Sequence, residues 1–316
     1  MNDPWFWRGA SPAARLSRAA LAPAAALYGA GQRWRIRSAR PFDPGIPVIC
    51  AGAAVIGGAG KTPFCLMLQR LLHAEGVAAH FLTRGYKGGL KGPVRVDAQH
   101  TVDDVGDEAL ILAAAAPAWV AKDRAAGAGA AAAAGAGVII MDDGFQNPAV
   151  KKTLSFLLLT GEEENLARFP AGPLRETAGE AMARADAVVL AFPRRRAAEA
   201  GGVPAFHAAG RLSLPLPPQR VAAFCGIARP ERFFAALEAQ GFALASRRAF
   251  ADHHAFAPGE IARLKAGAAG LPLITTEKDF VRLCPADRAG VAVARLALEA
   301  EDPDSLVRFV RERINR

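Results

Sequence analysis

The sequence predicts an α/β fold in which a doubly wound parallel sheet is followed by a second, smaller α/β domain. The first observation is a glycine-rich stretch, PVICAGAAVIGGAGKTP (47–63), set between an apolar run and a helical pattern. The second is the alternation of short apolar runs with helical patterns, which is typical of parallel sheets. The third is size: 316 residues, 52% of them hydrophobic, can fill one large core or two smaller ones.

Residues 1–40 are predicted to form a basic, aromatic membrane-docking segment. Three aromatic residues, Trp5, Phe6 and Trp7, open it, and a helix is expected over Ala13–Tyr28. It has no run of about 20 uninterrupted apolar residues, the length that a membrane span needs. Tryptophan anchors and arginine contacts to anionic lipid are instead typical of an interfacial helix. From these residues alone, a helix packed on the domain with its basic face in solvent is the alternative.

Residues 41–200 are expected to form a P-loop NTPase-like domain, because residues 47–63 predict a buried strand, a tight loop and a helix. The loop can surround a nucleotide phosphate with its backbone N–H groups, since it consists of Gly57, Gly58, Ala59 and Gly60. Lys61 would reach the outer phosphates, and Thr62 would ligate Mg²⁺. Val55 stands where this motif usually has glycine, so an ordinary glycine-rich turn with a surface lysine is the alternative.

Further apolar runs predict the other strands of this domain, over residues 78–83, Trp119–Val120, Gly137–Met141, Leu154–Thr160 and Ala185–Phe192. Helices are expected over residues 109–117 and over the alanine-rich Ala125–Gly137. Polar clusters follow most of these strands, and the carboxyl ends of parallel strands are where such sheets bind ligands.

Residues 201–220 are predicted to be a linker, since this stretch is rich in arginine, alanine, glycine and proline. A C-terminal α/β domain is expected over 221–302 and a C-terminal helix over 303–316. The strands of this part are predicted over Val221–Cys225, Leu271–Thr275 and Val291–Leu296. Its helices are predicted over Arg229–Gly241, Pro258–Ala268 and Pro303–Ile314.

The net charge of +9 favours anionic partners such as nucleotide phosphates, nucleic acid or anionic lipid. The chain carries no recognisable nucleic-acid-binding module, so we expect no nucleic acid partner. Its cysteines lie far apart in apolar patterns and are expected to be reduced core residues; they are Cys50, Cys65, Cys225 and Cys284.

Phosphoryl transfer needs groups that position phosphates, hold Mg²⁺ and orient or deprotonate an acceptor. Asp142 or Asp143, after a predicted strand, would hold Mg²⁺ together with Thr62, unless the two aspartates only cap a helix. The candidate bases are Asp107, Glu108 and His253. The candidate phosphate clamps are Arg84, Arg124, Arg175 and Lys278. The residue pattern alone thus predicts a P-loop NTPase with a second α/β domain.

Motifs spread over nearly the whole chain resemble those of the tetraacyldisaccharide 4′-kinase family of lipid A biosynthesis. They are the aromatic start with LYG (27–29), GGAGKTP (57–63), TRGYKGG (83–89), VGDE (105–108), KDR (122–124), DDGFQ (142–146), PAGPLRE (170–176), GIARPERFF (226–234), FADHHAF (250–256) and TTEKD (275–279). Each motif is weak by itself, whereas their joint occurrence in this order is highly specific.

The resemblance implies a kinase at the cytoplasmic face of the inner membrane, in the pathway to lipopolysaccharide. It would transfer the γ-phosphate of ATP, with Mg²⁺, to the 4′-hydroxyl of tetraacyldisaccharide 1-phosphate and so form lipid IVA. The resemblance also implies two α/β/α units joined by a short ribbon, with the active site between them. Residues 1–40 would then dock on an anionic membrane, because the acyl chains of the substrate stay in the bilayer.

Matched position by position, the resemblance assigns roles to single residues. Lys61 and Thr62 resemble the residues that bind phosphates and Mg²⁺, and Lys61 is also expected to act in catalysis. Asp107 resembles the catalytic base of the family. His253 resembles the partner of that base in a dyad.

The resemblance further implies a cluster of charges at the nucleotide. Asp142 and Asp143 resemble the acidic pair at the metal and phosphate site. Arg175 and Glu176 resemble a charged pair near the same site. We expect Arg175 to bind the nucleotide and Glu176 to be a further metal ligand.

The chain departs from the family pattern near the nucleotide, where hydroxyl and imidazole groups are missing. Gly52–Val55 stand in place of Gly-Asn-Leu/Ile-Thr, Ala59 in place of a threonine and Asn147 in place of a histidine. The loop at residues 162–169 is shorter than usual. We expect activity with weaker or rearranged nucleotide contacts, because the key lysine, threonine, aspartates and histidine are present.

Three alternatives to the lipid kinase stay open at this point. The first is a P-loop NTPase that acts as a switch or partner-binding module without a lipid acceptor, and it would not need Asp107 and His253 as a dyad. The second is a kinase for a soluble small molecule, which would not need residues 1–40. The third is a non-catalytic family member, in which the departures at Val55, Ala59 and Asn147 abolish ATP binding.

Overall fold

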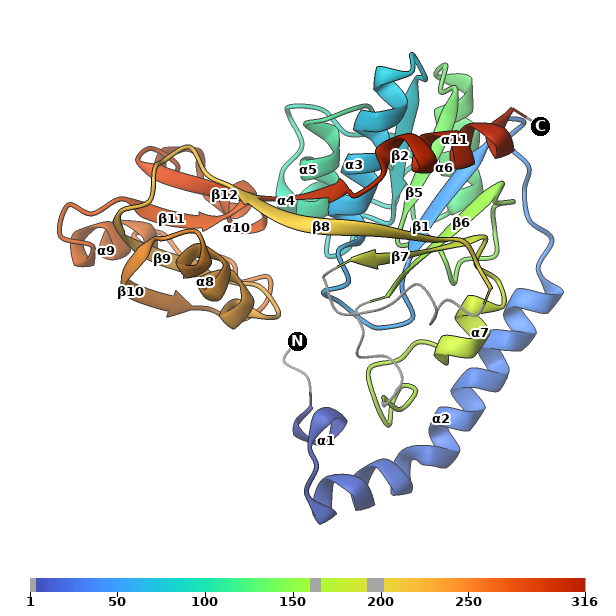
Figure 1. Cartoon of the computed structure of the whole chain (residues 1–316), viewed down its shortest axis with the longest axis horizontal. Coiled ribbons are helices and arrows are strands. Elements are labelled where there is room, and N and C mark those ends of the chain that lie inside the picture. The colour runs from blue at the N-terminus through green and yellow to red at the C-terminus, as the bar shows by residue number, and fades with distance from the viewer. Residues whose placement is uncertain (1–3, 160–165, 192–201, 316) are drawn as a thin grey trace. The chain divides into compact units, whose positions relative to one another are not determined.

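The computed structural model describes residues 4–159, 166–191 and 202–315. The chain forms two compact units: a large unit of residues 3–210 and 298–316, and a small unit of residues 211–297. Strand β8 (Ala205–Ser213) leads from the large unit into the small one, and β12 (Val291–Ala300) leads back. The two strands are hydrogen-bonded neighbours (Figure 1). The small unit is therefore an insertion between two paired strands.

The large unit contains a parallel sheet in the order β8-β7-β6-β1-β5-β2-β4-β3. The strands not yet named are β1 (Val48–Gly52), β2 (Ala79–Thr83), β3 (Val94–Arg95), β4 (Ala118–Val120), β5 (Val138–Asp142), β6 (Leu154–Leu159) and β7 (Ala187–Ala191). Pairing is parallel throughout except between β3 and β4. The chain order reverses beside β1, and this switch point is where a doubly wound sheet binds ligands. The predicted fold class is confirmed.

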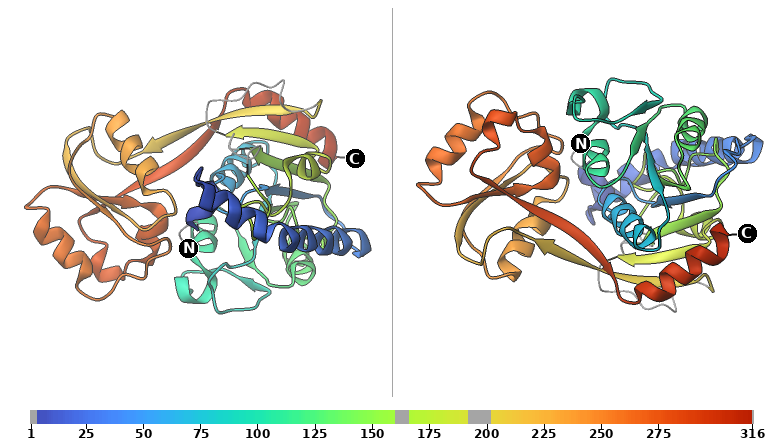
Figure 2. Two further views of the ribbon diagram at one scale, coloured as in Figure 1. Left: turned by 90° about the horizontal axis from the view of Figure 1, so that it is seen from below. Right: turned by 90° about the horizontal axis from the view of Figure 1, so that it is seen from above.

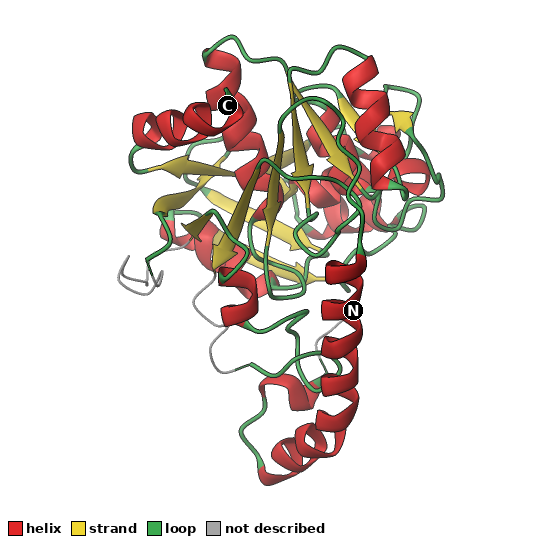
Figure 3. Ribbon diagram, turned by 90° about the vertical axis from the view of Figure 1, so that its right-hand side faces the viewer, coloured by secondary structure: helices red, strands yellow, loops and turns green. Residues whose placement is uncertain are grey.

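Helices lie on both faces of this sheet (Figures 2 and 3). They are α3 (Lys61–Ala74), α4 (Val102–Val105), α5 (Asp107–Ala113), α6 (Arg124–Ala133), α7 (Ala178–Met182) and α11 (Pro303–Ile314), whereas α1 (Trp5–Arg8) and α2 (Pro12–Ser38) extend away from the sheet (Figure 1). Each buries apolar side chains on the sheet, as the alternation of strands and helices predicts, except α1 and α2. Of the helices in the described ranges, none has the length and apolar character to cross a membrane.

Helix α2 is ten residues longer at its C-terminal end than the predicted helix over Ala13–Tyr28. It starts at Ser11, whose hydroxyl accepts the N–H of Ala14 at 3.2 Å, and it continues past Gly29 and Gly31. Glycine weakens a helical pattern, which is why the prediction stops early. At Gly29 the missing side chain has a structural reason, because a Cβ atom there would lie 1.9 Å from the Arg168 guanidinium.

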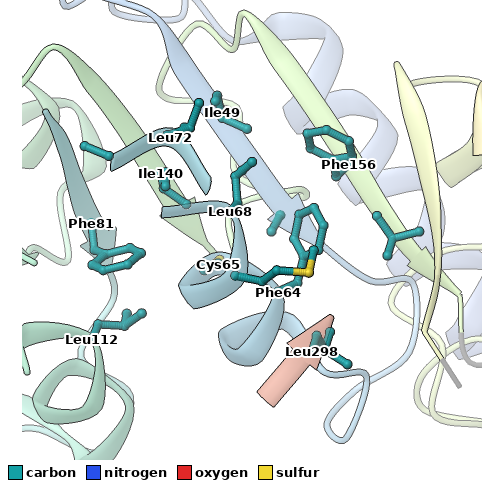
Figure 4. Close-up of a cluster of buried hydrophobic side chains, with 14 of the residues drawn as sticks. Ile49, Phe64, Cys65, Leu68, Leu72, Phe81, Leu112, Ile140, Phe156 and Leu298 are labelled. Atoms are coloured by element: carbon teal, nitrogen blue, oxygen red, sulfur yellow. The ribbon is translucent and has the colours of Figure 1, made fainter. Parts of the chain in front are cut away.

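The main core of the large unit lies between the sheet and helices α3 and α11. Phe64 of α3 packs 5.1 Å from the ring of Phe156 on β6, measured between ring centroids. Leu298 at the end of β12 joins this cluster (Figure 4), as do Leu306 and Val310 of α11. The predicted C-terminal helix is therefore part of the core of the large unit.

The small unit has parallel strands in the order β10-β9-β11-β12. Its other elements are β9 (Arg220–Cys225), α8 (Pro230–Ala239), β10 (Ala243–Ala249), α9 (Glu260–Gly267), β11 (Leu273–Thr276), α10 (Glu277–Arg282) and the 3₁₀ helix η3 (Pro285–Asp287). Strand β10 is at the edge of this sheet and largely exposed, so its sequence ALASRRA lacks the apolar pattern that would predict a strand.

Parts of the predicted domain scheme fall beyond the described ranges. The loop shortened at residues 162–169 is described only from residue 166, and the arginine-rich stretch at 192–201 lies outside the described residues. Within the predicted linker 201–220, residues 205–213 form β8. The domain limits 41–200 and 221–302 stay predictions.

The cysteine prediction is right for three residues and wrong for one. Cys50, Cys65 and Cys225 are buried, and burial raises the pKa of the Cys50 thiol to about 11. Cys284 is exposed. The apolar pattern around it belongs to Leu283, which is buried, while Cys284 begins the surface turn of η3.

Candidate active site

The glycine-rich loop between β1 and α3 has the backbone of a phosphate-binding loop. Gly57, Gly58 and Gly60 have φ angles of 73°, 67° and 77°. Glycine adopts this left-handed region without a steric penalty, and turns built in this way present N–H groups to anions. Lys61 is the first residue of α3, so the positive end of the helix dipole lies at the same place.

Two departures from the family pattern are buried beside this loop rather than pointing to a nucleotide. Val55 and Ala59 are each 1% exposed. Val55 forms an isolated antiparallel bridge with Leu174, and the N–H of Arg175 donates to the carbonyl of Ala54 at 2.8 Å. Val55 therefore helps to fix the segment that carries Arg175 against the phosphate loop.

Asp142, the last residue of β5, contacts the start of α3. The hydroxyl of Thr62 donates to Oδ2 of Asp142 at 2.8 Å. Its other oxygen, Oδ1, is buried and has no hydrogen-bond partner among the residues that the structure describes. Burial and the negative charge of Glu108 raise the pKa of Asp142 to about 7, against the opposing effect of Lys61. A buried carboxylate oxygen without a donor, next to a threonine hydroxyl, suits a divalent cation that prefers oxygen ligands.

Asp143 has the opposite electrostatic surroundings. Arg175 donates to its two oxygens at 2.5 and 2.8 Å, and Nζ of Lys61 lies 3.5 Å from Oδ1. Burial by itself would raise the pKa of Asp143, but the two cations hold it far below its usual value. Of two adjacent carboxyl groups, one is thus held ionised while the other titrates near neutrality.

Gln146 connects Arg175 to Glu176. Its Oε1 accepts from Arg175 at 3.1 Å, and its Nε2 donates to Glu176 at 2.8 Å and to the carbonyl of Ala53 at 2.9 Å. Glu176 is buried and forms an ion pair with Arg184. The contacts found for this predicted metal ligand are thus with an amide and a guanidinium. The described residues contain no group of three or more His, Cys, Asp and Glu side chains arranged to hold a metal ion.

Asn147, which stands where the family pattern has histidine, forms a hydrogen bond with the backbone of its own turn. Its side-chain oxygen accepts the N–H of Ala149 at 2.8 Å and closes a turn. The turn leads from the DDGFQ motif towards β6. We therefore assign Asn147 a structural role in this chain.

The N-terminal helices contact the same region. Nε1 of Trp7 donates to the carbonyl of Pro170 at 3.0 Å, and Arg35 donates to the carbonyl of Gln146 at 3.2 Å. The residues contacted belong to the PAGPLRE and DDGFQ motifs. The segment predicted to dock on a membrane is therefore hydrogen-bonded to the segments that carry Arg175 and Asp143.

Asp107, the predicted base, is the first residue of α5 and is 2% exposed. Its Oδ1 accepts the N–H of Glu108 at 2.9 Å. Because the charge of Glu108 acts on Asp142, the start of α5 lies within electrostatic reach of the phosphate-loop site. His253 belongs to the small unit, so the predicted dyad joins residues of two units and stays a prediction.

The candidate phosphate clamps follow different strands. Arg84 comes directly after β2, and Arg124 begins α6 after β4. Arg124 is 3% exposed and donates to the carbonyl of Ala121. Burial and the nearby charge of Arg84 lower the pKa of Arg124 to about 10. Lys278 lies on α10 of the small unit.

Four residues with buried or half-buried polar contacts were not predicted as site residues: Gln146 and Arg184 beside Glu176, and Asp279 and Arg282, which form an ion pair in the small unit. Gln146 lies inside the DDGFQ motif, next to the predicted acidic pair, so its position was a usable signal. Asp279 follows Thr276 at the spacing of a helix-capping pair. The contacts of the two arginines have no sequence signal.

Comparison with known proteins identifies the family of this chain. A family model described as LpxK, tetraacyldisaccharide-1-P 4′-kinase, matches residues 17–315. The tetraacyldisaccharide 4′-kinases of Rhodospirillum centenum and Paramagnetospirillum magneticum are each 46% identical to this chain; the matches cover 98% and 97% of it, and 96% and 97% of the relatives. The structure of LpxK from Aquifex aeolicus in complex with ATP superposes with a TM-score of 0.78 at 26% identity, over 94% of this chain and 99% of that one. The chain therefore belongs to the tetraacyldisaccharide 4′-kinase family.

Proposed function

We propose that this chain transfers the γ-phosphate of ATP to the 4′-hydroxyl of tetraacyldisaccharide 1-phosphate, the step that forms lipid IVA. The observation that carries the proposal is the pair of carboxylates beside the phosphate loop, where Asp142 contacts Thr62 and Asp143 contacts Lys61. The names of the relatives support the acceptor, since they are tetraacyldisaccharide 4′-kinases. The solved relative that carries ATP supports the donor.

Lys61 is the cation that we assign to the transferred phosphate. Arg175 binds Asp143 through two short hydrogen bonds, whereas Lys61 lies 3.5 Å from the same carboxylate. Lys61 is therefore the more loosely held of the two cations and can turn to the nucleotide. The N–H groups around Gly57, Gly58 and Gly60 would hold the neighbouring phosphates.

Thr62 and Asp142 are the residues that we assign to Mg²⁺. Oδ1 of Asp142 is a buried oxygen without a hydrogen-bond donor among the described residues, and the Thr62 hydroxyl donates to the other oxygen of the same carboxylate. When bound, Mg²⁺ neutralises charge on the phosphate oxygens. Asp143 would keep Lys61 in place before the nucleotide binds, because its carboxylate stays ionised. Glu176 would act indirectly, through Gln146 and Arg175.

Asp107 is our candidate for the group that accepts the proton of the 4′-hydroxyl. As the acceptor oxygen bonds to the γ-phosphorus, the bond from that phosphorus to the bridging oxygen of ADP breaks, and the hydroxyl proton passes to the Asp107 carboxylate. Its backbone lies at the start of α5, directly after Gly106, whose φ is 83° and whose N–H donates to the carbonyl of Val102 at 2.8 Å. His253 would complete the pair from the small unit.

Helices α1 and α2 would place the enzyme on the cytoplasmic face of the inner membrane as a peripheral protein. Large apolar side chains are exposed along them: Trp5, Leu16, Leu27 and Trp34 are 64%, 72%, 75% and 72% exposed. Leu27 and Trp34 are seven residues apart, about two helical turns, and so share a face. Arginines lie beside them, and the combination suits an interface with anionic lipid.

The test is transfer of label from γ-labelled ATP to tetraacyldisaccharide 1-phosphate in mixed micelles, with wild type beside Asp107→Asn and Lys61→Ala. We expect labelled lipid from wild type, little from either variant, and ATP binding retained by Asp107→Asn. Phosphate release without labelled lipid would favour the NTPase switch and overturn the lipid kinase. Absence of ATP binding by wild type would favour the non-catalytic family member.

A further inference from the structure

We propose that Arg282 and Asp279 are positioning residues for His253, which fix its neutral imidazole in the tautomer with the proton on Nε2. The ring would then donate a hydrogen bond from Nε2 to the carboxylate with which it acts. The proposal rests on the proposed role of His253 as the partner of Asp107. All three residues of this network belong to the small unit.

Asp279 is the anchor of the network. Its side chain is 0% exposed, and both oxygens accept hydrogen bonds. Oδ1 accepts the N–H of Gly226 and Nη1 of Arg282, each at 3.0 Å, and Oδ2 accepts the hydroxyl of Thr276 at 2.5 Å. A buried carboxylate with this many donors has one orientation, so it holds the Arg282 guanidinium in one place.

Arg282, held in this way, contacts the imidazole of His253. Its side chain is 5% exposed, and Nη1 also donates to the carbonyl of Gly226 at 3.0 Å. Nη2 lies 3.1 Å from Nδ1 of His253. A guanidinium has only N–H donors and keeps its proton in proteins, so Nδ1 must be the acceptor. In the neutral ring the proton therefore sits on Nε2.

The backbone of His253 is fixed by the same cluster. Its N–H donates to the carbonyl of Gly226 at 3.0 Å, the carbonyl that also accepts from Arg282. Its φ angle is 59°, in the left-handed region, which costs a residue other than glycine on the order of 1 kcal/mol. A side chain at Gly226 would crowd this cluster, because a Cβ atom would lie 3.0 Å from Oδ1 of Asp279 and from the carbonyl of Ala251.

This geometry limits what the imidazole can do. Its basic nitrogen, Nδ1, faces a permanent cation, so His253 is not arranged to take a proton from the acceptor hydroxyl. Nε2 lies 3.8 Å from Oδ2 of Asp252, beyond hydrogen-bond distance, and an Nε2–H group can donate to a carboxylate and orient it. The proton of the 4′-hydroxyl would then go to Asp107, while the ring keeps its own proton throughout.

The experiment combines a spectroscopic and a kinetic readout on the full chain. In protein labelled with ¹⁵N-histidine, long-range ¹H–¹⁵N spectra at pH values where the ring is neutral distinguish the two tautomers. We expect Nδ1 of His253 to resonate as an unprotonated nitrogen in wild type. In Arg282→Met we expect a mixture of tautomers and a kcat lower by about tenfold, with KM for ATP unchanged. Arg282→Lys should recover part of both.

The matched control is Arg288→Met. Arg288 is a half-buried arginine that follows α10 in the chain, but it donates to the carbonyls of Leu283 and Val281 rather than to His253. We expect wild-type spectra and kcat from this variant. If Arg282→Met fails to fold, Asp279→Asn tests the same network, because it weakens the ion pair that fixes Arg282.

Each remaining outcome overturns a definite part of the proposal. A protonated Nδ1 in wild type, or an unchanged tautomer and kcat in Arg282→Met, would overturn the role of Arg282. Full kcat in His253→Ala, with the expected tautomer in wild type, would instead overturn the role of His253 on which the proposal rests. The spectra separate the two failures.

Discussion

The Arg175 guanidinium holds the Asp143 carboxylate with two hydrogen bonds, of 2.5 and 2.8 Å. The backbone N–H of the same arginine donates to Ala54, at the entrance of the phosphate loop. Arg175 therefore joins a segment far along the chain to Asp143 and to the glycine-rich loop. Its planar fork keeps Asp143 ionised and, in the proposed function, leaves Lys61 available for phosphate.

Arg175→Lys retains a positive charge but cannot form two parallel hydrogen bonds with one carboxylate. Asp143 would then bind Lys61 more closely, and we expect kcat/KM for ATP to fall about 10- to 100-fold. Steady-state kinetics with varied ATP would measure this change. Arg184→Lys, which alters the ion pair with Glu176 and not the contact with Asp143, is the control and should lose less. Wild-type kinetics in Arg175→Lys would contradict this role.

Thr62→Val removes the hydroxyl that donates to Asp142 and keeps the volume of the side chain. We expect the Mg²⁺ concentration for half-maximal activity to rise by about tenfold or more, because both the metal ligand and its neighbour are affected. Thr62→Ser should restore the wild-type value, since it keeps the hydroxyl. An unchanged Mg²⁺ dependence in Thr62→Val would contradict the proposed role of Thr62 as a Mg²⁺ ligand.

Asp142 makes stability depend on pH in the metal-free protein. Its pKa is about 7 in the folded chain against an ordinary value of 3.8, so the folded state binds the extra proton between these values. The stabilisation from this proton is fully present below about pH 4 and is lost as the pH rises through 7. Asp142→Asn cannot ionise, so its Tm relative to wild type should rise from pH 5 to pH 8.5.

Differential scanning fluorimetry in EDTA measures that difference in Tm. Mg²⁺ with ATP should reduce it, because the bound ion stabilises the ionised carboxylate of wild type. A difference in Tm that stays constant from pH 5 to pH 8.5 would show that Asp142 has an ordinary pKa.

Two glycines of α2 provide a matched pair of variants. Gly31→Ala meets no atom within 4 Å and should raise the free energy of unfolding by up to about 1 kcal/mol, through helix propensity. Gly29→Ala gains the same propensity but displaces the Arg168 guanidinium, which is ion-paired with Glu180. We expect Gly29→Ala to be clearly less stable than Gly31→Ala in urea titrations. Equal stabilities would mean that Arg168 adjusts without losing its contacts.

Leu27 and Trp34 test the membrane role of α2. Replacing both with serine removes mainly exposed apolar surface, since the two residues are 75% and 72% exposed. We expect weaker binding to vesicles that contain anionic phospholipid, measured by co-sedimentation, with ATP affinity unchanged. Serine at the exposed Leu296 of β12 is the control and should leave vesicle binding as in wild type. Equal binding of all three proteins would contradict docking through α2.

The parts of the fold that the sequence predicted well are those with local signals. The strand, loop and helix around Lys61 follow from glycine positions and apolar runs, and the structure has them at the expected residues. Family membership also followed from motif order and is confirmed. Helices α7 and α10 are short, so their apolar periodicity is too weak to predict a helix, although Thr177 and Thr276 stand at their N-caps.

The parts of the site that could not be predicted depend on contacts between distant segments. Nothing near Glu176 in the sequence indicates that it pairs with Gln146, 30 residues earlier, because that pairing requires the folded chain. Likewise, Val55 was counted as a departure from a motif, whereas its pairing with Leu174 requires the folded chain. The roles predicted for Asp107, His253, Glu176 and the metal ligands stay predictions.

The insertion of the small unit between β8 and β12 has a consequence for protein synthesis. Leu306 and Val310 of α11 pack in the same core as Phe64 and Phe156. On the ribosome, that core stays open until α11 has been translated, although most of its other residues are made early. The inserted unit is continuous in sequence, so nearly all of its residues are available sooner. The large unit is therefore begun first and completed last. Until α11 has been translated, the apolar sheet face of this unit stays exposed, and chaperones would bind there.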